Sequence, residues 1–183
     1  MKITISAAAK LAVSAKYDGT NGLYMCALPR EDMLKSIHKI CVDLGIENRE
    51  DLKPEKFHVT IMYSKASPNV EWTHETFDIL PSHLLIPEAI ISGLDVFNGH
   101  DGKFYLVATL ESHELNHLHN IFTNVGAVHS YPKYNPHITL VAFETREEYE
   151  QYKKTIDTVS DYLNANPVVI EFKLLPPTNI VGD

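Results

Sequence analysis

The sequence has little cysteine and no pattern in which cysteine would bind a metal. Cys26 and Cys41 are the only two in 183 residues, with no C-x-x-C pair and no zinc-finger spacing. Cys26 lies in an apolar, strand-like run, and Cys41 lies on the apolar face of a predicted helix. We therefore expect two buried free thiols rather than a disulfide, which is typical of a protein in a reducing cytoplasm.

Positive charge and long apolar runs are also scarce. Lys and Arg number 16 against 24 Asp and Glu, giving a formal net charge of −8 and a pI of about 5.6. A long nucleic acid is therefore not an expected partner, because its binding uses broad basic surfaces. No apolar run approaches the ~18 residues of a membrane span, and the lysines within Met1–Ala15 make that segment a poor signal peptide.

A small anionic ligand is compatible with this charge, because a few local cations and backbone amides can hold one phosphate. The composition, 44% hydrophobic and 22% charged, is that of an ordinary globular protein. The length fits a single domain over residues 1–183. We expect a monomer or a small homo-oligomer.

Two segments, 23–63 and 104–143, repeat the same order of predicted elements: strand, helix, loop, strand. The polar region 64–83, which holds the only tryptophan, Trp72, is predicted to be an irregular insert. Two units related by an approximate two-fold axis would bring their last strands together beside a groove, in an α+β architecture. The predicted strands are 23–28, 57–63, 87–97, 103–110, 137–143 and 168–175, and the predicted helices are 30–44, 112–125 and 145–163.

Turn and capping residues mark several of these boundaries. The Asn-Gly and Asp-Gly pairs within 98–102 favour a hairpin between the two flanking strands. Ser112 and Thr145 are of the residue type that caps a helix N-terminus. Pro176-Pro177 is expected to end the last strand.

The last predicted strand of each repeated segment contains a His-x-Thr tripeptide. The two tripeptides are His58-Val59-Thr60 and His137-Ile138-Thr139. Alternate side chains of a strand share a face, so each histidine points the same way as the threonine two residues later. The apolar residues between and around them point the other way. If the two strands lie side by side, two imidazoles and two hydroxyls meet in one patch.

Such a patch can cleave a phosphodiester without a metal or another cofactor. Histidine has a pKa of about 6.5, so both protonation states are accessible near neutral pH. One ring in its neutral form can act as a base, and the other in its charged form can act as an acid. Thr60 and Thr139 would donate hydrogen bonds to the non-bridging phosphate oxygens. The nucleophile is a 2′-hydroxyl or water, and the sequence does not assign the base to either histidine.

These residues resemble the 2H phosphoesterase superfamily, whose pattern is two His-x-Thr/Ser motifs, each followed by a hydrophobic residue. His58-Val59-Thr60-Ile61 and His137-Ile138-Thr139-Leu140 match that pattern. The resemblance extends over residues 23–175. It implies a bilobal fold with two pseudo-symmetric strand-helix-strand lobes and antiparallel sheets around a central groove.

Within the superfamily, the chain is most similar to viral nucleases that degrade the cyclic di- and trinucleotide signals of bacterial CBASS immunity. The resemblance implies cleavage of 3′-5′ linkages in those signals, in the host cytoplasm. That group carries a tyrosine on its first strand and a glutamate near its C-terminal strand, and Tyr24 and Glu171 stand in comparable places. Both residues are therefore candidates for substrate binding. Tyr24 is alternatively a core residue, and Glu171 alternatively lies on the wet side of an edge strand.

The loop before His137 offers three further candidates for substrate binding. Lys133 could contact a phosphate, and Tyr131 or Tyr134 could stack on a base. The alternative is an ordinary loop with partly buried tyrosines.

Other functions remain open on the same residues. The site could act on 2′,3′-cyclic phosphates at RNA ends or on small nucleotides, or the protein could bind a cyclic nucleotide without cleaving it. The His-x-Thr motifs could be ordinary half-buried polar faces. His113, His117 and His119 include an i, i+4 pair that could bind zinc, but a solvated helix face is the simpler interpretation, because no third ligand is evident.

Overall fold

A computed structural model of the chain describes residues 21–64, 80–124, 127–131, 133–176 and 178–181. Met1–Ala15, Trp72 and most of the predicted insert 64–83 lie outside the described residues. The strands are β1 (Asn21–Pro29), β2 (Val59–Ser64), β3 (Glu88–Asn98), β4 (Phe104–Glu111), β5 (His137–Phe143), β6 (Val168–Leu174) and β7 (Thr178–Val181). The helices are α2 (Leu34–Asp43), α4 (Ser82–Leu85), α5 (His113–Asn124) and α6 (Arg146–Ala165), with 3₁₀ turns at Glu31–Met33 and Pro54–Lys56.

The strands form one sheet in the order β2-β5-β4-β3-β6-β1-β7, and β1 also pairs with β2. Every strand pairing is antiparallel. The sheet therefore folds back on itself, and the first two strands of the chain meet although they stand far apart in the strand order. The predicted α+β class with antiparallel sheets is confirmed.

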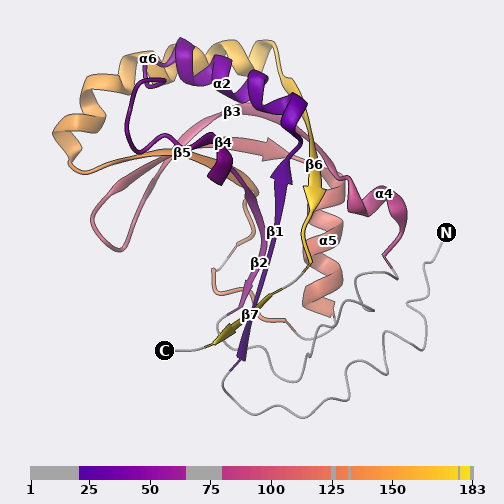
Figure 1. Ribbon diagram of the computed structural model, residues 1–183. Helices are drawn as coiled ribbons and strands as arrows, with labels where there is room; N and C mark the ends of the chain where they lie inside the picture. Colours follow the sequence, from indigo (N-terminus) through magenta and orange to yellow (C-terminus); the bar gives the residue numbers. More distant parts are fainter. Residues whose placement is uncertain (1–20, 65–79, 125–126, 132, 177, 182–183) are drawn as a thin grey trace.

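The helices cover this sheet with their apolar faces. In Figure 1, α2 and α6 lie together at one end of the sheet and α5 lies at the other. Their buried side chains join the strand residues in a single core because each helix places an apolar residue every three or four positions. Those residues are Ile37, Ile40 and Cys41 of α2, Leu115, Leu118 and Phe122 of α5, and Ile156, Val159 and Leu163 of α6.

Both predicted helix caps are confirmed. The Ser112 hydroxyl accepts a hydrogen bond from the Leu115 N–H at 3.0 Å, and the Thr145 hydroxyl accepts one from the Glu148 N–H at 3.2 Å. The predicted 98–102 hairpin is also confirmed, since β3 and β4 pair on either side of it. Gly102 adopts φ 83°, which a residue with a side chain rarely does.

Two predictions about the helices and strands are wrong. The helix expected over 30–44 begins as a 3₁₀ turn, because Arg30 is extended and bonds its backbone N–H to Glu171 of β6. β6 ends at Leu174, before Pro176-Pro177, as predicted, but it is not the last strand: residues 178–181 form β7 and pair with residues 21–24 of β1. No periodicity in a segment of four residues indicated that strand.

Both cysteines are buried and free, as expected. Burial raises the pKa of the Cys26 thiol, and it raises the pKa of the Cys41 thiol to about 12. Among the described residues, no helix has the length and apolar character needed to cross a bilayer.

Replacing the α6 cap should lower stability measurably. We expect Thr145→Ala to lower the free energy of unfolding by about 0.5–2 kcal/mol, because the Glu148 N–H loses its partner. Thr158→Ala is the matched control: Thr158 is also exposed, but it lies inside α6, where its hydroxyl bonds the Lys154 carbonyl. Alanine favours helix there, so urea unfolding of this variant should show equal or slightly higher stability. Equal losses in both variants would contradict the capping role.

Candidate active site

The two histidine motifs lie side by side on neighbouring strands. β2 and β5 pair antiparallel, with Val59 opposite Ile138. Those two residues are fully buried, whereas His58, Thr60 and His137 are half-buried and Thr139 is exposed. The alternation expected of the two strands is therefore present, and the polar members of both motifs share the face opposite the core.

The register fixes how the four polar side chains are arranged. One residue on either side of the Val59–Ile138 pair, His58 stands opposite Thr139 and Thr60 stands opposite His137. The two histidines occupy a diagonal of the antiparallel pair, where side chains lie about 7–8 Å apart. The structure thus joins the four residues predicted to form the reaction centre, with one threonine beside each histidine.

Each histidine ring is held by the same local hydrogen bond. The Nδ1 of His58 lies 2.8 Å from the Lys56 carbonyl oxygen, and the Nδ1 of His137 lies 2.7 Å from the Asn135 carbonyl oxygen. A carbonyl oxygen only accepts, so each Nδ1 must carry the hydrogen. The Nε2 atom of each ring is left to accept or donate a proton, and both rings have the same tautomer when neutral.

The environments of the two histidines differ. Burial lowers the pKa of His137 below its ordinary value; the Asn135 carbonyl opposes this shift, and the charge of His58 adds to it. The Phe97 ring, from β3, contacts the His137 ring edge to face, with centroids 4.9 Å apart. His137 is therefore biased toward its neutral form, with burial as the main cause.

Tyr24 lies beside the first motif, as its predicted role requires. Its ring meets the His58 ring edge to face at 6.4 Å, and its hydroxyl shares a side-chain hydrogen bond with Thr60. Burial raises the pKa of Tyr24 to about 12, so the phenol stays protonated at neutral pH. Cys26, directly opposite Thr60 in the β1–β2 ladder, also interacts with Tyr24.

Glu171 is not on an edge strand, so that part of the alternative is wrong, although its side chain is partly exposed to solvent as that alternative expected. β6 lies between β3 and β1, and the Glu171 carboxylate accepts a hydrogen bond from Arg30 at 2.6 Å in an exposed ion pair. A contact between Glu171 and a nucleobase would have to share the carboxylate with Arg30, or displace it.

The Arg30–Glu171 pair nevertheless lies on the face of the sheet that carries the reaction centre. Cys26 of β1 stands opposite Thr60, and Leu28, two residues on, stands opposite Lys173 of β6. Glu171 shares the face of Lys173 because the two are separated by one residue. Lys173 therefore shares this face of the sheet, and Arg30 reaches it through its ion pair with Glu171.

The loop residues before His137 are placed in different surroundings. Tyr131 is 55% exposed and contacts Tyr63 of β2, with ring centroids 6.2 Å apart. Lys133 is exposed. Tyr134 stacks one face of its ring on His119 at 4.1 Å, and its buried hydroxyl has no hydrogen-bond partner among the described residues. An unsatisfied buried hydroxyl costs about 1–3 kcal/mol.

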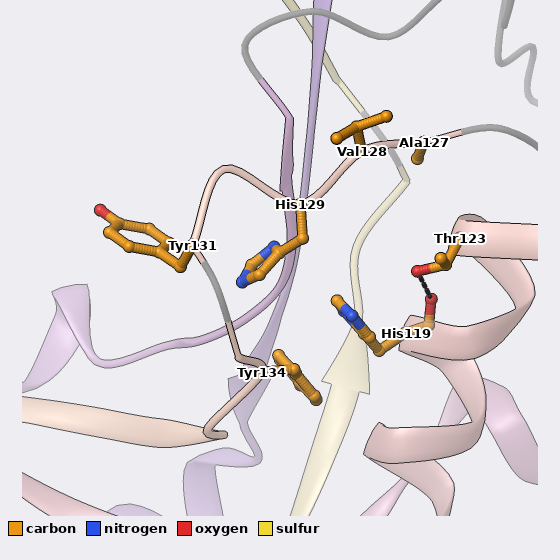
Figure 2. A pocket seen from close by; sticks show the side chains of 7 residues that line it. All are labelled: His119, Thr123, Ala127, Val128, His129, Tyr131 and Tyr134. Atoms are coloured by element: carbon orange, nitrogen blue, oxygen red, sulfur yellow. Dashed lines mark hydrogen bonds between the residues drawn. The ribbon is translucent and has the colours of Figure 1, made fainter.

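A pocket of about 390 Å³ lies beside the histidine pair rather than over it. Figure 2 shows the rings of His119 and Tyr134 face to face, the His129 ring next to them, and Tyr131 beyond His129. The pocket is lined by His119, Thr123, Ala127, Val128, His129, Tyr131 and Tyr134. His119 thus belongs to this pocket rather than to a solvated helix face, whereas His113 is exposed at the start of α5.

Comparison with known proteins assigns the chain to a family. The family model described as "Anti-CBASS protein Acb1" matches residues 21–169. The chain belongs to this family. The expected similarity to anti-CBASS proteins is therefore confirmed at the level of the family, whereas the two-histidine chemistry stays a prediction.

Relatives in the family come from several bacteriophages, and each is described as an anti-CBASS protein Acb1. The Vibrio phage KVP40 protein is 29% identical over 126 residues, covering 69% of this chain and 76% of the relative. The Yersinia phage phiR1-RT protein is 28% identical over 155 residues, covering 85% and 94%. The Enterobacteria phage T4 protein is 30% identical over 123 residues, covering 67% and 73%.

One solved structure with a similar chain trace is that of Kluyveromyces marxianus Usb1 with uridine monophosphate. It has a TM-score of 0.42 and 12% sequence identity, covering 88% of this chain and 98% of that chain.

The sequence did not indicate several residues that contact the candidate site. Arg30, Tyr63 and Phe97 contact candidate site residues, yet none stands within a motif. Arg30 follows a strand directly, which was the one available signal that it lies at the rim of the sheet. The position of Tyr63 depends on a bulge in β2, and Phe97 reaches His137 from β3.

Titration of His137 tests the asymmetry between the two histidines. We expect its NMR-detected pKa to lie below the ordinary value for histidine, because burial disfavours the imidazolium. His58→Ala removes an imidazole whose charge lowers the pKa of His137, so that pKa should rise but stay below the ordinary value for histidine, since burial is the larger cause. An unchanged His137 pKa in this variant would show that the rings do not interact.

Proposed function

We propose that this protein is a metal-independent phosphodiesterase that cleaves the 3′-5′ linkages of cyclic di- and trinucleotide immune signals. The observation that carries the proposal is the pairing of β2 with β5, which puts two histidines with available Nε2 atoms on one face beside two threonines. The same four residues support membership of the 2H phosphoesterase superfamily, and with it a bilobal fold over residues 23–175. Its membership of the anti-CBASS Acb1 family supports cyclic nucleotides as the substrate class.

The lowered pKa of His137 supports a division of roles between the two histidines. His137, biased to the neutral form, takes a proton on Nε2 from the attacking hydroxyl of water or of a ribose 2′ position. The new P–O bond forms as the bond to the leaving ribose oxygen breaks. His58, in its charged form, gives its Nε2 proton to that oxygen. His137 gains one proton and His58 loses one, so the summed charge of the two histidines is unchanged. After the step His137 is the charged ring and His58 the neutral one.

The threonines stabilise the charge that develops on the phosphate. Thr60 and Thr139 stand on the same face as the histidines, each opposite one of them. Their hydroxyls can donate to the two non-bridging oxygens, which carry more negative charge in the transition state than in the substrate. Tyr24, bonded to Thr60, positions that hydroxyl, and its ring can stack on a base.

The remaining candidates would bind the substrate outside the reaction centre. We infer that Lys133 and Tyr131 contact it from the loop and that the Arg30–Glu171 pair contacts it from β6. Tyr134 supports this loop from within, because its ring is stacked on His119. The protein would act in the cytoplasm of a bacterial host, where the signals are made.

A substrate panel tests the reaction and the absence of a metal requirement. We expect cleavage of at least one cyclic di- or trinucleotide with equal rates in the presence and absence of EDTA. Chromatography of the products against 2′,3′-cyclic and 5′-phosphate standards identifies the nucleophile. A loss of activity with EDTA would overturn the metal-free mechanism. Preferential cleavage of a 2′,3′-cyclic mononucleotide would show that 2′,3′-cyclic phosphates are the substrate class. Tight binding without cleavage would indicate a protein that sequesters the nucleotide.

Removal of either histidine should abolish most of the turnover. We expect His58→Ala and His137→Ala each to lower kcat by about 10²–10⁴-fold, because each loses one proton transfer. His38→Ala is the matched control, since His38 is exposed on α2. Circular dichroism must show that all three variants are folded. A near-normal rate in either test variant would exclude that histidine from the reaction.

A further inference from the structure

The pocket beside the histidine pair is built where β2 stops pairing with β5. The two strands pair at Val59–Ile138 only, so the backbone of β2 beyond Thr60 needs other partners. His119 Nδ1 lies 2.8 Å from the Ile61 carbonyl oxygen, the Tyr63 N–H donates to His129 Nδ1 at 3.5 Å, and the Ser130 N–H donates to the Tyr63 carbonyl at 2.8 Å. Two histidines therefore occupy positions that a neighbouring strand would otherwise fill.

These bonds fix what each ring can offer to a ligand. The Ile61 carbonyl only accepts, so His119 carries its hydrogen on Nδ1, and its neutral ring presents Nε2 as an acceptor. His129 accepts on Nδ1, so its neutral ring carries the hydrogen on Nε2 and presents a donor. The pocket thus contains one acceptor and one donor among aromatic rings. This is the pairing that the hydrogen-bonding edge of a nucleobase complements.

A row of rings joins this pocket to the reaction centre. Tyr24 contacts His58 at 6.4 Å, Tyr63 contacts Tyr24 at 6.3 Å, and Tyr131 contacts Tyr63 at 6.2 Å. His129 then contacts Tyr131 at 5.6 Å. Each spacing is within the range of aromatic contact, so the rings form a continuous series of contacts from His58 to the pocket (Figure 2 shows the end at the pocket).

We propose that the pocket between α5 and the end of β2 is the subsite for the second nucleobase of a cyclic dinucleotide. The inference rests on the proposed function for the position of the scissile phosphate. The first base lies near Tyr24, and the ring of the second stacks on Tyr131 while its edge meets His119 and His129. The site therefore recognises the two-base ligand and not only the phosphodiester.

The competing explanation is purely structural: His119 and His129 satisfy the edge of β2 and nothing more. Variants of these two residues would not separate the explanations, because they would also disturb the strand. Tyr131 does separate them, since its side chain is 55% exposed. Tyr162 of α6, 58% exposed and outside the pocket, is a matched control for the loss of a surface tyrosine.

The experiment compares two ligands that differ by one base. Cyclic di-AMP and an analogue in which one ribose lacks its adenine are titrated into the full-length His137→Ala protein, in which turnover is suppressed. We expect the complete ligand to bind roughly 10-fold or more tightly than the analogue, the size typical of one stacked base. Adding Tyr131→Ala should bring the two Kd values close together, whereas adding Tyr131→Phe or Tyr162→Ala should keep the difference.

Two results would overturn the subsite. One is equal affinity for both ligands in the parent protein, and the other is a preference for the complete ligand that survives Tyr131→Ala. Failure of the proposed function is seen separately. In that case the unaltered protein leaves cyclic di-AMP and the other cyclic oligonucleotides intact, while the binding measurement still reports on the pocket.

Discussion

The antiparallel contact between Val59 and Ile138 is the constraint on which the site depends. It is a single ladder pair between segments far apart in the chain, and both side chains are fully buried. Burial of these two residues fixes the register, because a slip by one residue would turn the polar face of a strand into the core. The same register puts a threonine opposite each histidine, so core packing and site geometry are consequences of one interaction.

Beyond that contact, β2 and β5 no longer pair, and a pocket lies beside the end of β2. A fully paired β2 would have no need of His119 and His129 as hydrogen-bond partners. The short ladder has a cost, since backbone groups of Ile61 and Tyr63 need side-chain partners. The loop before His137 supplies one of those partners and at the same time delivers the histidine itself.

Most elements could be predicted from the sequence because their signals are local. The period of two around His58 and His137, the Asn-Gly turn and the Ser112 and Thr145 caps each lie within a few residues. The Arg30–Glu171 pair and β7 could not, because both depend on the neighbours of β1, which only the sheet order defines. The placement of His119 could not be predicted for the same reason: the i, i+4 pair is His113 and His117, and nothing in the sequence indicated that β2 lies against His119.

The two motifs are alike in sequence and in their Nδ1 hydrogen bonds, yet acid–base catalysis needs them to differ. Local geometry cannot supply that difference, because each histidine bonds the carbonyl two residues before it. The difference comes from tertiary packing. Phe97 lies against His137 and burial disfavours its charged form, while His58 meets Tyr24 at a greater distance. A repeated unit thus yields two distinct groups because the sheet surrounds its two copies unequally.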